Sequence, residues 1–228
     1  HVSIVIFSLL LGGMVGIVAR AGGTFGLVEA LTPHATSSRR GQLVTWLLGI
    51  LIFFDDYANT LLVGNTMRPV TDGLRISREK LAYIVDSTAA PVSCLALVTT
   101  WIGYEVGLIG TAVEKIDGLE LSAYAVFLSS IPFSFYPILA IFFVFAIVLS
   151  RNDFGPMYHA ELRARSTGQL LRPDASVDPE ATSGEHTTPK EGKPQRALNA
   201  IIPVAVLVLG VVVGLLVTGE GDNVRDII

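Results

Sequence analysis

The sequence predicts an all-α protein that crosses a membrane several times, with broken helices, a re-entrant hairpin or both. The chain is 51% hydrophobic and only 16% charged, whereas soluble domains carry about a quarter charged residues. The charges are also segregated, so several uncharged runs approach the roughly 20 residues that cross a bilayer core as a helix. Carboxylates nevertheless occur inside two apolar runs, where irregular backbone is a common way to accommodate them.

Four apolar runs are candidate spanning segments, namely residues 2–19, 81–104, 123–150 and 198–218. The first has no basic flank before it and no cleavage pattern after it, so it does not resemble a signal peptide. A single cysteine, Cys94, excludes a disulfide framework. The chain begins with His1 and ends soon after an apolar run, and we therefore interpret it as a fragment cut at both ends.

The distribution of lysine and arginine predicts the topology. Residues 151–197 contain seven of them and residues 68–80 contain four, whereas residues 105–121 contain one. By the positive-inside rule, the first two segments are cytoplasmic and the third is external. The sequence thus divides into a transmembrane region with the chemically informative motifs (1–150), a hydrophilic cytoplasmic loop (151–197), and a last helix with a short external tail (198–228). The loop is rich in Pro, Ser, Thr and Gly, a composition that predicts disorder.

Residues 41–64 do not fit this topology simply, because Arg39 and Arg40 precede them and the basic segment 68–80 follows. Either this region is a re-entrant hairpin, or it spans the membrane and the charge rule fails at one end. Alternatively, residues 2–31 form the hairpin, with its tip in the glycine cluster 22–26. Irregular backbone at membrane depth requires cover by protein or a water-filled cavity, and secondary transporters build ion sites from such elements.

The stretch 53–60 carries the first candidate site. A carboxylate at the centre of a spanning helix costs about 2.5–3.5 kcal/mol, and Asp55 and Asp56 are adjacent there. Helical spacing would pair Asp55 with Asn59 and Asp56 with Thr60, giving each carboxylate a neutral oxygen such as hard cations prefer. We expect one aspartate to bind an ion and the other to pair with Arg68. The alternative is that the aspartates mark a helix end at the membrane boundary.

The second candidate site is the run Asp86, Ser87 and Thr88, shortly before Pro91. Proline lacks an N–H and disturbs the preceding helical turn, so we expect a break or kink that frees carbonyl oxygens here. A carboxylate, two hydroxyls and these carbonyls could coordinate a dehydrated cation. The alternative is a structural kink in which Asp86 pairs with an arginine such as Arg75.

Three segments together resemble the NhaC family of Na⁺/H⁺ antiporters. They are residues 51–72 (LIFFDDYANTLLVGNTMRPVTD), 76–92 (ISREKLAYIVDSTAAPV) and 100–105 (TWIGYE). The similarity is dense over residues 9–109 and elsewhere extends only to hydropathy. It implies one repeat of an inverted-repeat transporter, and a parent chain about twice as long.

The resemblance implies a transporter rather than an enzyme, one that exchanges Na⁺ for H⁺ across the cytoplasmic (inner) membrane. Asp55, Asp56 and Asp86 would be the Na⁺ ligands, and one carboxylate that binds either ion suffices for exchange if burial raises its pKa toward the working pH. The expected partners are the bilayer, the two ions and a second copy of the chain; no cofactor and no nucleic acid are expected. The rivals are a Na⁺- or H⁺-coupled organic anion or amino acid exchanger of the same family, and a non-transporting membrane subunit.

Overall fold

The protein is all-helical in the computed structural model, which describes residues 2–116, 121–175 and 195–218; the described residues contain no strand. The elements, in chain order, are α1 (Val2–Arg20), α2 (Gly23–Leu31), η1 (Thr32–His34), α3 (Ser38–Leu51), α4 (Asp56–Gly73), α5 (Arg78–Leu95), α6 (Thr100–Val113), α7 (Ala123–Ser130), η2 (Ile131–Phe133), α8 (Phe135–Ser150), α9 (Gly155–Thr167) and α10 (Leu198–Thr218).

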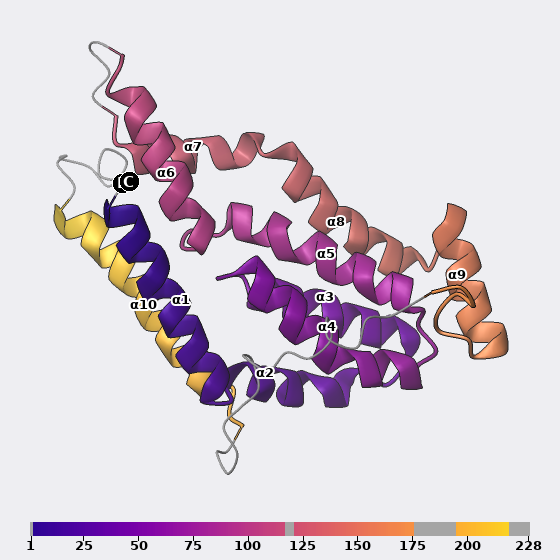
Figure 1. The fold of residues 1–228 in the computed structure, drawn as a ribbon. Coiled ribbons are helices and arrows are strands. Elements are labelled where there is room, and N and C mark those ends of the chain that lie inside the picture. Colours follow the sequence, from indigo (N-terminus) through magenta and orange to yellow (C-terminus); the bar gives the residue numbers. More distant parts are fainter. Residues whose placement is uncertain (1, 117–120, 176–194, 219–228) are drawn as a thin grey trace.

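Helix α5 lies at the centre of the fold and packs against α3, α4 and α8. Helices α1 and α10 lie side by side along one flank, α6 and α7 lie at one end, and α9 lies at the opposite end (Figure 1). The main core joins α1, α2, α3, α4 and α5, and its fully buried side chains include Leu48, Ile52 and Met67. Trp46 of α3 donates a hydrogen bond to the Ile141 carbonyl of α8 at 3.1 Å.

Helices α3 and α4 form an antiparallel hairpin whose tip is residues 52–55. The beginning of α3 packs beside the residues that follow α4: a Cβ at Gly41 would lie 2.5 Å from Leu74 Cδ1. The basic residues before α3 and those around the start of α5 are therefore at the same end of the hairpin. This geometry is the one that the re-entrant alternative for region 41–64 requires, in which both basic segments lie on the same side.

Two of the expected continuous spans are bent or broken. Residues 123–150 form two helical pieces bent by 46°, Ala123–Phe133 and Phe135–Ser150, and Pro132 lies at the junction. Residues 81–104 are also interrupted, but not where proline predicted: α5 continues through Pro91 to Leu95, and the break is residues 96–99. A proline costs a helix one hydrogen bond and a steric clash, and the packing around α5 compensates for this.

By length and apolar character, no single helix of the described residues qualifies as a membrane span. Two bent pairs do qualify together, Gly12–Arg20 with Gly23–His34 (60°) and Ala123–Phe133 with Phe135–Ser150. Helix α10 contains a shorter apolar part, Leu198–Gly210.

The expectation of disorder is wrong for the first part of segment 151–197, because α9 is a helix that is fixed to the α4–α5 corner. Glu161 is 2% exposed and accepts a hydrogen bond from the Ser77 backbone N–H at 2.8 Å. Arg163 pairs with Glu79 at 2.8 Å, and Lys80 pairs with Asp153 in a buried ion pair. Composition alone missed these long-range pairs. Residues 176–194 of the segment lie outside the described residues.

Candidate functional site

The two helix breaks, residues 52–55 and 96–99, are joined at one place in the fold. Ser93, near the end of α5, donates a hydrogen bond to the Phe53 carbonyl at 3.1 Å. Thr99 donates to the Ser93 carbonyl at 3.1 Å, and the indole N–H of Trp101 donates to Asp56 Oδ1 at 3.0 Å. Unwound backbone from two chain segments thus meets beside the start of α4, as in the ion sites of transporters with broken helices.

Asn59 is the central polar residue of this region. Its side chain is fully buried, and Nδ2 points at three carbonyl oxygens: Gly49 at 2.6 Å, Ile52 at 2.9 Å and Thr88 at 3.4 Å. Its Oδ1 is buried and has no hydrogen-bond partner among the described residues. Buried polar atoms are almost always paired, so an orphaned oxygen beside a cluster of carbonyls marks a place where a bound group would be stabilised.

Close contact between α3 and α5 brings these carbonyls together. A Cβ at Gly49 would lie 2.0 Å from Thr88 Oγ1 and 2.6 Å from Thr88 Cβ, so only glycine fits. The Thr88 hydroxyl is directed along its own helix, where it donates to the Ile84 and Val85 carbonyls at 2.8 and 3.2 Å. Thr88 therefore contributes its backbone carbonyl to the cluster around Asn59, rather than the hydroxyl that the sequence suggested.

The two adjacent aspartates have different surroundings. Asp55 is the N-cap of α4 and accepts the Ala58 N–H at 2.7 Å. Asp56 is the first residue of α4 and accepts from Trp101. Helix α4 begins only at Asp56, so the two aspartates lie at a helix end, as the alternative interpretation of residues 53–60 has it. Arg68 lies twelve residues after Asp56 along α4, about 18 Å at the helical rise, and lines the groove between α4 and α5.

Asp86 is separate from the Asn59 cluster. It is exposed and lines a groove of about 730 Å³ between α4 and α5, together with Thr60, Arg68 and Asn65. Ser87 is half-buried and Thr88 is buried. Among the described residues, no three His, Cys, Asp or Glu side chains converge. The carboxylates named from the sequence do not form one metal centre there, and the oxygens that do converge are carbonyls.

Comparison with known proteins identifies the family. The family model described as "Na+/H+ antiporter family" matches residues 92–225, more than half of the chain. The chain belongs to the Na⁺/H⁺ antiporter family. The match includes the second half of the chain, where we had expected similarity in hydropathy only. The family that the model describes is one of ion transporters rather than of enzymes.

A curated relative extends the similarity to almost the whole chain. An uncharacterised protein of Haemophilus influenzae is 31% identical over 227 residues, which are 99% of this chain and 41% of the relative. The antiporter-family chain thus spans less than half the length of that relative. No solved structure matches the chain.

Sequence reasoning missed Gly49, Ile52, Ser93 and Trp101 of this antiporter-family site. Gly49 and Ile52 contribute carbonyl oxygens, which every residue has, so side-chain chemistry gives no signal for them. Ser93 and Trp101 bond across the two breaks, and only the packing of the breaks against each other reveals their role. A glycine within an apolar run was the one available hint of close backbone contact.

Proposed function

We propose that the protein exchanges Na⁺ for H⁺ across the cytoplasmic membrane, and that Na⁺ binds where the two helix breaks meet. The observation that carries the proposal is Asn59, a fully buried amide whose Oδ1 is unpaired while three carbonyl oxygens surround its Nδ2. The family match supports cation/proton exchange as the type of transport.

The Asn59 amide can respond to an ion by rotation. An amide presents donors on one side and an acceptor on the other. If it turns by half a revolution, Oδ1 joins the carbonyls of Gly49, Ile52 and Thr88, and four oxygens then face one point. Four acceptors repel one another unless a cation lies among them, and hard cations prefer oxygen ligands. With Na⁺ absent, the Nδ2 group of Asn59 stabilises the three carbonyl oxygens instead, by donating hydrogen bonds to them.

Asp56 is the group that we assign to proton exchange. It lies three residues before Asn59 on the first turn of α4, so the two share a helix face. Its hydrogen bond comes from a neutral indole N–H, which leaves its charge available to offset Na⁺ or to accept a proton. Asp55 is instead committed to capping α4. Loss of Na⁺ and gain of a proton at Asp56 would keep the local charge constant, as exchange requires.

Sodium-dependent stability tests the site, and ion flux tests the function. In the full-length protein, Na⁺ replacing choline should raise the melting temperature of the wild type and of the control Asn152→Ala, since Asn152 is exposed in the α8–α9 connection. Asn59→Ala and the milder Asn59→Ser should lose this increase. In proteoliposomes, an outward proton gradient should drive ²²Na⁺ uptake without any organic solute. Equal Na⁺ stabilisation in all four proteins would refute the assignment of Asn59.

The groove between α4 and α5 favours a second candidate, a Na⁺- or H⁺-coupled exchanger of organic anions. Its volume of about 730 Å³ suits a small organic molecule, and Arg68, Arg78 and Arg172 line it. Under this alternative the Asn59 site binds only the coupling ion. Ion flux that appears only when an organic anion is added to the proteoliposomes would favour the second candidate over the first.

A further inference from the structure

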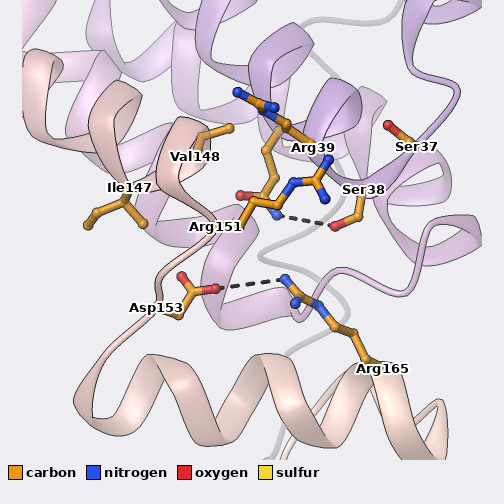
Figure 2. Close-up of a pocket in the computed structure, with 9 residues that line it drawn as sticks. Ser37, Ser38, Arg39, Ile147, Val148, Arg151, Asp153 and Arg165 are labelled. Atoms are coloured by element: carbon orange, nitrogen blue, oxygen red, sulfur yellow. Dashed lines mark hydrogen bonds and ion pairs between the residues drawn. The ribbon is translucent and has the colours of Figure 1, made fainter.

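Three arginines from three different elements converge on a small cavity where α8 ends. The cavity has a volume of about 260 Å³ and is lined by Arg39 of α3, Arg151 just after α8, and Arg165 of α9. Figure 2 shows the three side chains around it, with Ser38 on the α3 side and Asp153 below. Ser37 caps α3 at this point, so the positive end of the α3 dipole adds to the field of the arginines.

The charge in the cavity is only partly neutralised. The single carboxylate in its lining, Asp153, already forms a buried ion pair with Lys80 and lies 3.8 Å from Arg165. Arg165 also pairs with Glu161 at 3.0 Å. The ion pairs of the described residues include neither Arg39 nor Arg151. Within the part of the chain that the structure describes, Arg39 and Arg151 thus line the cavity without an ion-pair partner.

Arg151 adopts an unusual backbone conformation at this site. Its φ is +60°, in the left-handed region, and a helix usually ends there with glycine. An arginine in this conformation costs free energy that glycine would not. An outlier of this kind is commonly retained where the side chain has a function, and this side chain lies at the cavity (Figure 2).

An apolar cavity adjoins the basic one. Its volume is about 290 Å³, it shares Ile147 and Asp153 with the basic cavity, and Phe143, Phe154 and Met157 are among its other lining residues. A phosphate group in the basic cavity could therefore continue into an acyl chain along α8. Inorganic phosphate has no acyl chain, so it would occupy only the basic cavity and leave the apolar cavity empty.

We propose that this paired cavity binds the phosphate group of an anionic phospholipid, with Arg39 and Arg151 contacting the phosphate and the apolar cavity holding part of an acyl chain. Guanidinium groups match phosphate with two parallel hydrogen bonds. Basic pockets between helices at the cytoplasmic side of a membrane are a recurrent form of lipid site. The site is independent of the Na⁺ site, because it is built from the opposite end of α3.

Lipid binding to the delipidated full-length protein tests the proposal without any transport assay. The probes are dioctanoyl phosphatidylglycerol, dioctanoyl phosphatidylcholine and inorganic phosphate, and bound lipid is measured by native mass spectrometry. Phosphatidylglycerol should bind the wild type most tightly. Arg39→Gln and Arg151→Gly should each weaken the binding of phosphatidylglycerol about fivefold. This factor corresponds to the loss of about 1 kcal/mol that one basic residue contributes to binding an anionic lipid.

The variants separate lipid binding from folding. Arg151→Gly suits the left-handed backbone, so it removes the guanidinium without harming the fold. Arg40→Gln is the matched control, because Arg40 is the exposed neighbour of Arg39, its side chain does not line the cavity, and its guanidinium donates to Thr36 at 3.0 Å. Equal affinity in wild type, Arg39→Gln and Arg151→Gly overturns the proposal, and so does an equal loss in Arg40→Gln. If inorganic phosphate competes for the site as tightly as the lipid binds, the lipid part of the proposal is overturned.

Discussion

Replacing Gly49 by alanine should destabilise the protein although alanine is the better helix former. The added Cβ would lie 2.0 Å from Thr88 Oγ1 and 2.6 Å from Thr88 Cβ, where ordinary contacts begin at 3.4 Å. Neither Thr88 atom is the far end of a flexible chain, so α3 must move away from α5. Overpacking of this kind costs about 1–3 kcal/mol, and we place this case at the upper end. The helix propensity of alanine returns at most about 1 kcal/mol, so the expected net loss is about 2 kcal/mol.

Thermal unfolding in detergent measures this loss, and Gly64→Ala is the matched control. Gly64 lies within α4, and a Cβ there would meet nothing within 4 Å, so this variant should be neutral or more stable. Movement of α3 would also separate the Gly49 and Thr88 carbonyls around Asn59, so Gly49→Ala should lose part of the stabilisation by Na⁺. If Gly49→Ala melts at or above the wild-type temperature, the close contact of α3 with α5 is wrong, and so is the site built on it.

Three further predictions concern the carboxylates and the topology. Asp56→Asn should abolish ²²Na⁺ uptake against an outward proton gradient, whereas Asp55→Asn should keep α4 capped, because asparagine is an equally good cap; wild-type exchange in both mutants would place the ion site elsewhere. Asp86→Asn should leave the stabilisation by Na⁺ intact, because Asp86 lies in the groove between α4 and α5 and not in the Asn59 cluster; loss of that stabilisation would bring Asp86 back into the ion site. In a Cys94→Ala background, a cysteine beside Lys115 should react with an impermeant thiol reagent on intact cells and one beside Arg172 should not; the reverse pattern would invert the proposed topology.

The sequence predicted the broken character of this fold better than the positions of the breaks. Residues 52–55 lie inside region 41–64, for which the charge pattern left a re-entrant hairpin open, but no residue pattern placed a break at these four positions. Pro91 was misleading: α5 passes through it, and the break follows at residues 96–99. The sequence alone does not show which packed helices compensate for the hydrogen bond that a proline removes from its helix.

Prediction of the candidate site was limited by the nature of its atoms. Asn59 was named because helical spacing places its neutral oxygen on the same face as Asp55, but the partners of its amide are carbonyls of Gly49, Ile52 and Thr88. Their convergence depends on helix packing, which no residue type encodes. Helix α9 was missed for a related reason: its composition predicts disorder, whereas a hydrogen bond and an ion pair with residues 84 positions earlier help to hold it in place.

The attachment of α9 to the α4–α5 corner has a consequence for biosynthesis. The Ser77 N–H and its acceptor Glu161 are 84 residues apart. At about 5–20 residues per second, a ribosome needs roughly 4–17 s to add that length. During this interval Ser77 has been synthesised, but the carboxylate that accepts the hydrogen bond of its N–H does not yet exist. The corner between α4 and α5 therefore lacks this hydrogen bond until α9 has been made.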